Sequence, residues 1–321
     1  MNLLSPGVVV LQMLDALLLF LASIALILSV SIARKWDPDA TTPQQYRLEK
    51  RSYLVATVVA YIFYLKLLLF LYFIHTLDDL AALLPGAMCA AGVTDATPYG
   101  TPLFVVKILD LYLFGLWLVL HRIDTKRVDR PYTRTKFRLY LLLFPFLVLE
   151  TILQFLHFGA IDPHRIVSCC GTLFSAPKTP LIGLFTTLPA PAVAGLFYLL
   201  YAAILLAWLR RSPTATAISN LLFIPVAVLS LITLFSTYIY QMPHHHCPFC
   251  LLQADYGYVG YLLYTALFGG TFFGLAAWVA EKCGDGRVRR WMVWSVALDT
   301  LYVAVVSFHP IAYYLENGVW L

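Results

Sequence analysis

Hydrophobic and polar positions along this chain fall into long blocks and do not alternate with a short period. Apolar runs of 20 residues or more are separated by short polar segments. A helix needs about 20 apolar residues to cross the hydrocarbon of a bilayer, whereas a membrane β-strand is a run of about ten residues of alternating polarity. The pattern therefore predicts an all-α, polytopic transmembrane helix bundle. We place eight spans, at about residues 8–33, 52–75, 102–121, 139–158, 190–209, 217–240, 257–280 and 291–314.

The composition supports a membrane protein. The chain is 61% hydrophobic and 12% charged, against roughly 25% charged residues in soluble proteins. A soluble protein is therefore excluded, and the lipid bilayer is the first expected partner. The net charge of +5 does not indicate a nucleic-acid partner, because the basic residues lie in the loops. The first apolar run is too long for a cleaved signal peptide, so we expect a permanent first helix.

Lys and Arg residues are concentrated in every second loop. The loops that follow odd-numbered spans, such as 34–51 and 122–138, hold 18 of the 22. By the positive-inside rule these loops are cytoplasmic, so both termini are expected to be extracytoplasmic. We expect a single integral-membrane domain over residues 1–321, in a bacterial inner (plasma) membrane. Its outward loops are predicted at about 76–101, 159–189 and 241–256.

Cysteine and histidine gather on the predicted outer side. Seven of the eight histidines and five of the six cysteines fall there, in a compartment that permits disulfides. The outward cysteines are Cys89, Cys169, Cys170, Cys247 and Cys250. Because five is an odd number, one of them has no intrachain disulfide partner when the others are paired. This concentration indicates chemistry at the extracytoplasmic face.

The most specific local motif is Cys247-Pro248-Phe249-Cys250, directly before span seven. With Cys247 at the helix N-cap and Pro248 at the first helical position, the helix dipole would stabilise a Cys247 thiolate. Cys250 could then resolve a mixed disulfide. Over these four residues the motif resembles a thioredoxin-type active site. Its placement is similar to that in membrane disulfide oxidases and the vitamin K epoxide reductase family, where outward cysteine pairs lie at helix ends above a quinone.

These features predict a membrane thiol–disulfide oxidoreductase or electron relay. Cys247 would attack a disulfide and Cys250 would resolve the intermediate. Cys89, Cys169 and Cys170 would relay electrons to an extracytoplasmic thiol protein, and the resemblance implies a link to quinone.

Three alternatives remain open from the sequence. His244, His245 and His246, together with Cys247 and Cys250, are ligand types suited to copper or zinc, which would make the protein a metal-binding or transport protein with a metal-binding partner. A haem-containing electron-transfer subunit would use His75, His157 or His309 as axial ligands. The paired cysteines could also form a structural disulfide that pins the loop.

Ionisable residues inside the predicted spans are costly in lipid and should face the interior of the bundle. They are Asp15, Lys66, Lys107, Asp110, Glu150 and Asp299. Lys107 and Asp110 are three residues apart and are expected to pair, and Glu150 or Asp15 is the expected partner of Lys66. Glu150, Gln154 and His157 form one polar stripe. With Lys66, the stripe could bind a quinone headgroup or carry protons.

Overall fold

The computed structural model of this chain describes residues 5–37, 40, 42–162, 164, 166–167, 189–243 and 245–321. Within these ranges the chain is helical and has no strand. Eight helical segments are long and apolar enough to cross a membrane, which confirms the predicted fold class and number of spans. Their bounds are α1 Pro6–Lys35, α2 Pro43–Ala81, α4 Gly100–Thr125, α5 Thr133–Ala160, α7 Ala190–Leu209, α8 to α9 Pro213–Tyr240, α10 Val259–Lys282 and α11 Val288–Asn317.

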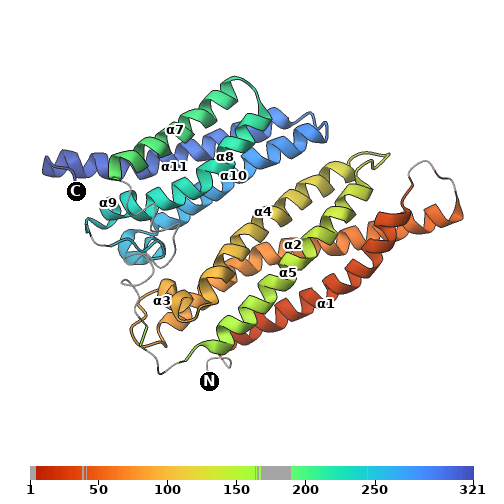
Figure 1. The fold of residues 1–321 in the computed structure, drawn as a ribbon, viewed down its shortest axis with the longest axis horizontal. Coiled ribbons are helices and arrows are strands. Elements are labelled where there is room, and N and C mark those ends of the chain that lie inside the picture. The colour runs from red at the N-terminus through yellow and green to blue at the C-terminus, as the bar shows by residue number, and fades with distance from the viewer. Residues whose placement is uncertain are drawn as a thin grey trace. The chain divides into compact units, whose positions relative to one another are not determined.

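The chain divides into two compact units, Met1–Val167 and Ser168–Leu321, which we name unit 1 and unit 2. In unit 1, α1 packs against α2 and α5, and α4 packs against the same two helices (Figure 1). Helices that follow one another are neighbours, so this is an up-and-down four-helix arrangement. The short helix α3, Ala90–Asp95, packs against α2 and α4.

Unit 2 repeats the same order of neighbours with the next four spans. Helix α8 packs between α7 and α10, and α11 contacts both α10 and α7. The sixth span consists of α8 (Pro213–Ser230), a π-helical turn η2 (Leu231–Phe235) and α9 (Ser236–Tyr240). Two single 3-10 turns, η3 (Cys250–Leu252) and η4 (Ala254–Tyr256), then lead to α10.

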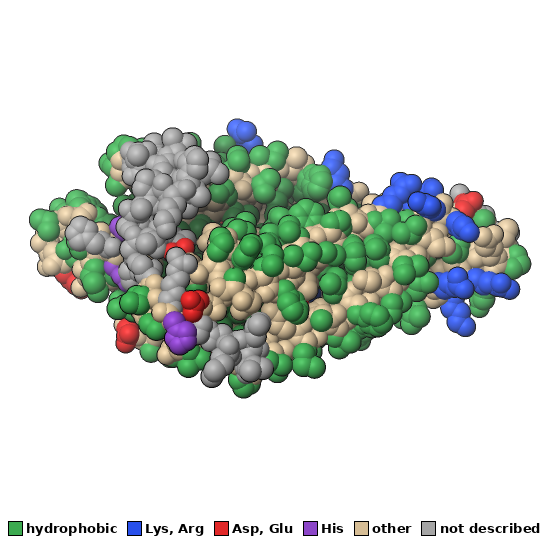
Figure 2. Space-filling view, turned by 60° about the horizontal axis from the view of Figure 1, so that its bottom comes forward, with side chains coloured by type: hydrophobic (Ala, Val, Ile, Leu, Met, Phe, Trp, Pro, Cys, Tyr) green, Lys and Arg blue, Asp and Glu red, His purple; other side chains and the backbone are tan. Residues whose placement is uncertain are grey.

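The interior of the helix units contains polar and small residues beside hydrophobic ones, and many large apolar side chains lie on the outside. On α1 the buried residues include Gln12, Asp15 and Ser29, whereas Leu17 and Ile27 are exposed. Exposed apolar side chains of this kind are expected where lipid surrounds the helices, because an apolar side chain gains little by turning inward from lipid. The space-filling view shows hydrophobic side chains over much of the visible face (Figure 2).

Several helices extend beyond the hydrocarbon layer. Helix α2 has 39 residues, which corresponds to about 58 Å at 1.5 Å per residue, against a hydrocarbon thickness of about 30 Å. Its first turns carry Arg47, Lys50 and Arg51. The predicted basic loop 34–51 is therefore partly helical.

Candidate functional site

The segment that carries the paired cysteines is irregular rather than helical. Helix α10 begins at Val259, so Cys247 is not its N-cap, and the predicted stabilisation of Cys247 by that helix dipole is wrong. The backbone conformation explains why α10 begins later in the sequence than predicted. Gln253 is extended, with φ −85° and ψ 158°, and Gly257 and Tyr258 both have positive φ, 61° and 56°. An α-helix cannot pass through these conformations.

Cys247 and Cys250 nevertheless lie together. Their sulfur atoms are within 4.8 Å of one another, and the two residues are buried, with exposed fractions of 2% and 6%. The Tyr240 hydroxyl donates to the carbonyl of Cys247, and the Tyr264 hydroxyl donates to that of Pro248 at 2.6 Å. The cysteine turn, residues 247–250, is thus held from α9 on one side and from α10 on the other.

The packing of α10 on this segment depends on a glycine. A Cβ atom at Gly260 would lie 2.8 Å from the backbone carbonyl of Leu251. Contacts this short do not occur in folded proteins, so only glycine permits the approach. The position of the cysteine turn is therefore specified by the sequence of the helix that follows it.

The histidines next to the turn have separate partners. The Nδ1 atom of His246 donates to the carbonyl of Ile232 at 2.9 Å; because a carbonyl can only accept, this nitrogen carries the hydrogen. Ile232 lies in the π-helical turn η2. The ring of His245 packs edge-on against Tyr240 at 4.4 Å between ring centres. Burial lowers the pKa of His245, and the neighbouring His246 lowers it further.

The predicted metal site is not assembled by the described residues of unit 2. Within residues 189–243 and 245–321, no imidazole nitrogen or carboxylate oxygen lies within 4.8 Å of both sulfurs. His245 and His246 are instead engaged with Tyr240 and Ile232. His244, the remaining predicted ligand, lies outside the described residues.

The other cysteines fall in different places. Cys89 is buried and directly precedes α3, whose first amide, that of Ala90, donates to Asp78 Oδ1 at 3.2 Å. Cys283 is buried at the end of α10. The predicted relay residues Cys169 and Cys170 lie outside the described residues. The predicted approach of the three outward loops to one another stays a prediction.

Unit 1 contains a network of buried ions. The Nζ atom of Lys66 is 2.8 Å from Asp15 Oδ1 and 2.8 Å from Glu150 Oε2, which confirms both predicted partners. Lys107 pairs with the other oxygen of Glu150. Gln154 donates to Asp15 Oδ2 at 2.6 Å. Four helices therefore meet through charged side chains in the interior of the unit.

The predicted pair of Lys107 with Asp110 is wrong. Lys107 reaches across to Glu150 on α5, and the buried Asp110, which is 2% exposed, forms no ion pair within the described part of the chain. Lys107 and Asp110 do share one face of α4, as predicted. Glu150 on the facing helix takes the ammonium instead.

The polar stripe on α5 is confirmed in its geometry, since Glu150, Gln154 and His157 are all buried. His157 Nδ1 lies 2.6 Å from the Thr97 hydroxyl. The predicted quinone set of Lys66, Glu150, Gln154 and His157 is thus a packed network whose members bind one another or neighbouring side chains. Of the predicted haem ligands, His75 has a side chain that is 67% exposed and pairs with Asp79, and His157 is buried. The haem alternative stays a prediction.

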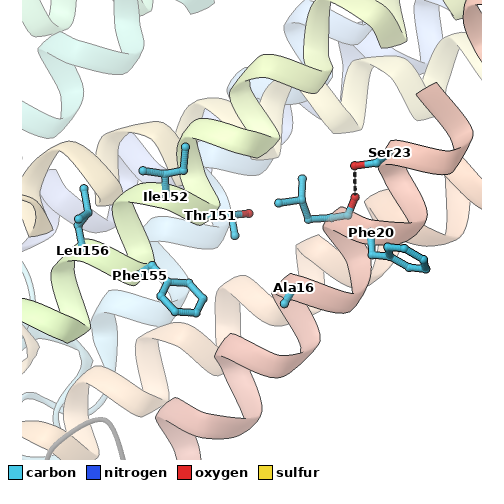
Figure 3. A pocket seen from close by; sticks show the side chains of 8 residues that line it. Ala16, Phe20, Ser23, Thr151, Ile152, Phe155 and Leu156 are labelled. Atoms are coloured by element: carbon cyan, nitrogen blue, oxygen red, sulfur yellow. Dashed lines mark hydrogen bonds between the residues drawn. The ribbon is translucent and has the colours of Figure 1, made fainter. Parts of the chain in front are cut away.

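A groove of about 490 Å³ lies between α1 and α5 of unit 1 (Figure 3). It is lined by Ala16, Leu19, Phe20, Ser23, Thr151, Ile152, Phe155 and Leu156. The hydroxyls of Ser23 and Thr151 donate to carbonyls of their own helices, at 2.8 and 2.9 Å. Since none of the four predicted quinone ligands lines it, the groove offers apolar contact without a polar anchor for a headgroup.

Two buried polar clusters do not follow from the sequence reasoning. In unit 2, Ser295 donates to Asp299 at 3.1 Å and accepts from Asn220 at 3.2 Å. The four-residue spacing of Ser295 and Asp299 on one helix face was the available signal. In unit 1, Lys136 and Asp124 form a buried ion pair at 2.6 Å, and both fall in the basic loop 122–138 that the sequence predicts to be cytoplasmic.

The chain matches no known protein family, and no characterised protein or solved structure is significantly similar to it. An assignment of function therefore depends on the chemistry of the cysteine turn and of the buried charges.

Proposed function

We propose that this multi-pass membrane protein is a thiol–disulfide oxidoreductase of a bacterial inner membrane, and that Cys247 and Cys250 are its reactive pair. The supporting observation is the separation of their sulfurs, within 4.8 Å of one another in a turn held by Tyr240 and Tyr264. A disulfide needs sulfurs at about 2.05 Å and Cα atoms at about 4.4–6.8 Å. Side-chain rotation with a small backbone adjustment would close the pair.

The reaction is a two-step exchange. The Cys247 thiolate attacks one sulfur of a substrate disulfide, which forms a mixed disulfide and releases the first substrate thiolate. The Cys250 thiolate then attacks the Cys247 sulfur, which forms the Cys247–Cys250 disulfide and releases the second substrate thiolate. Two electrons pass from the cysteine pair to the substrate, and the reverse sequence oxidises a substrate dithiol.

Burial of the pair favours exchange with a flexible segment over direct contact with a large folded protein. Cys89, Cys169 and Cys170 are the cysteines of this chain that the charge pattern puts on the same side of the membrane. In our proposal they pass electrons between the buried pair and an extracytoplasmic thiol protein. We also propose that both termini of the chain are extracytoplasmic.

The chemistry is tested by trapping the intermediate. In Cys250→Ser the second step cannot occur, so a mixed disulfide through Cys247 should accumulate and appear as a slower band on a non-reducing gel. The band should be absent when Cys247→Ser is added. Cys283→Ser is the matched control, because Cys283 is also buried in unit 2 but lies at the opposite end of α10.

The same gels distinguish a redox site from a metal site. Added to Cys250→Ser, the changes His244→Ala and His245→Ala should leave the trapped band intact, since thiol exchange needs no imidazole ligand. If Cys250→Ser traps nothing and the histidine variant loses bound copper or zinc, the oxidoreductase proposal is overturned and the metal alternative replaces it.

A further inference from the structure

The ion network of unit 1 has one more acidic group than basic groups. It contains three buried carboxyl groups, Asp15, Asp110 and Glu150, and two buried ammonium groups, Lys66 and Lys107. If all were ionised, the network would carry one uncompensated negative charge inside a helix unit surrounded by hydrocarbon. Such a charge is strongly disfavoured, and the group takes up a proton instead.

Asp110 is the carboxyl group that remains after the pairs are assigned. Lys66 binds both Asp15 and Glu150, and Lys107 binds Glu150. No N–H or hydroxyl group donates to either oxygen of Asp110 in the described part of unit 1, and its hydrogen-bond neighbour is the Glu150 carboxyl group. A carboxylate would need several donors in this environment, whereas a protonated carboxyl group is neutral and tolerates their absence far better.

The charged groups around Asp110 come from every long helix of unit 1. Lys107 lies on α4 with Asp110, Lys66 lies on α2 and Glu150 lies on α5. The charge of each of the three affects the ionisation of Asp110. Asp15 on α1 belongs to the network through Lys66. The short α3 carries one titratable group, Asp95, at its last residue.

Buried polar side chains continue from this network toward the end of the unit where α4 begins and α5 ends. The ring of His157 lies against Gly100, where a Cβ atom would be 2.8 Å from the ring carbon Cε1. Lys107 lies seven residues after Gly100 on α4, and Glu150 lies seven residues before His157 on α5, and these two side chains pair. Seven residues correspond to about 10 Å along a helix axis. Gln154 lies between them on α5, and its Oε1 atom and the Nε2 atom of His157 are buried without hydrogen-bond partners in the described residues.

The opposite side of the network is closed by aromatic rings. Phe63 stacks on Phe114 at 4.2 Å, and its ring centre is 5.2 Å from Trp117 and 6.0 Å from Tyr140. Phe114 lies one helical turn beyond Asp110 on α4. The polar atoms of Trp117 and Tyr140 donate to backbone carbonyls at 2.8 and 2.7 Å, so they are already engaged. We name these four rings the aromatic block.

We propose that Asp110 is a proton-binding site that exchanges with one side of the membrane only, through the Gln154–His157 path, and that the aromatic block closes the other side. The bound species is H⁺: the carboxyl group releases it to become a carboxylate, and the path carries it past Gln154 and the His157 imidazole. The proposal rests on unit 1 alone and is independent of the thiol chemistry proposed for unit 2.

Infrared spectroscopy of the full-length protein in lipid nanodiscs tests the protonation. The wild type should show a carbonyl stretch of a protonated carboxyl group that shifts in D₂O and disappears in Asp110→Asn. Asp110→Glu should retain such a band at a changed frequency, which covers the case that the amide variant does not fold. Asp299→Asn is the matched control, because it alters another buried carboxyl group that forms no ion pair among the described residues, and it should leave the Asp110 band in place.

The path is tested by the rate of exchange. His157→Phe should slow the shift of the Asp110 band in D₂O, whereas Phe155→Leu, a change on the exposed face of the same helix, should not. Proton binding at Asp110 is overturned if the folded Asp110→Asn variant keeps every carboxyl band of the wild type. It is also overturned if Na⁺ or K⁺ abolishes the wild-type band. An unchanged exchange rate in His157→Phe would overturn the path.

Discussion

Lys66 shows how a single residue can hold an ion network together. Its ammonium bridges Asp15 on α1 and Glu150 on α5, so three helices depend on one positive charge. A buried ion pair adds little net stability compared with an apolar pair, but removing one partner leaves the other charge uncompensated. Removing the charge of Lys66 alone should therefore destabilise unit 1 more than removing the charges of Lys66 and its partners together.

Replacing Lys66 by Met should destabilise unit 1 strongly. The side chain keeps its length while the charge is lost, and breaking a buried pair in this way typically costs about 3–5 kcal/mol. The shift of the thermal unfolding midpoint in detergent measures the effect. Lys66→Met combined with Glu150→Gln should be closer to wild type than Lys66→Met alone. A double variant less stable than the single one would contradict the bridging role.

The partners of Lys66 could be predicted from the sequence, but the position of Lys107 could not. Lys66 has no carboxylate within its own span, so its partner had to come from another span, and Asp15 and Glu150 were the candidates. For Lys107 the nearer residue in sequence, Asp110, was the obvious choice. The choice between Asp110 and Glu150 depends on how α4 and α5 face each other, and no pattern within one helix contains that information.

At the scale of helices, close contact in unit 2 depends on one glycine of an adjacent pair. A Cβ atom at Gly270 would lie 2.3 Å from Asp299 Oδ1 and 2.9 Å from the Asp299 backbone nitrogen. At Gly269 the nearest atom would be the end of the Leu298 side chain at 3.1 Å. The first contact involves backbone, which cannot move aside, and the second involves a flexible side chain.

Gly270→Ala should therefore push α10 and α11 apart, whereas Gly269→Ala should be tolerated. Forcing an extra methyl group into a packed interface costs about 1–3 kcal/mol. At Gly269 a small clash is offset by the higher helix propensity of Ala, worth about 1 kcal/mol. Unfolding of the two variants in the same detergent provides the comparison, and equal stabilities would show that α10 does not approach α11 through Gly270.

The elements themselves were largely predictable, because an apolar run of sufficient length has one stable structure in lipid. The start of α10 was not. The residues Gly257 and Tyr258 break the helix through positive φ, and tyrosine gives no warning of that conformation. The π-helical turn η2 was equally invisible, since the sequence Leu231–Phe235 is as apolar as the α-helix before it.

For the whole molecule, the charge pattern predicts which ends of the helices face the cytoplasm. A cysteine introduced at Met242 should react with a membrane-impermeant maleimide on intact cells, because residue 242 lies in a predicted outward loop and its side chain is exposed. A cysteine at Gly286, between Lys282 and Arg287, should react only after the cells are permeabilised. Reaction of the Gly286 variant on intact cells would reverse the orientation and the compartment assigned to the cysteine turn.

The division into two units is the large-scale feature that the sequence did not reveal. It falls at Val167 and Ser168, within the predicted loop 159–189, and the apolar pattern is similar on both sides. Helix order within each unit follows from short connections, which make successive helices neighbours. Which helices form a closed group depends on side-chain fit, and a pattern of spans does not encode that fit.

The π-helical turn η2 has a consequence for how relatives of this chain could be recognised. A π turn contains one more residue than the α turn it replaces, so it is equivalent to a single insertion that rotates everything after it by about 100°. Tyr240 and Ser236 follow the insertion, and Tyr240 reaches the carbonyl of Cys247 from that rotated position. In an alignment, a chain with the same cysteine turn should carry the extra residue, and a one-residue gap in the sixth span should coincide with loss of the paired cysteines.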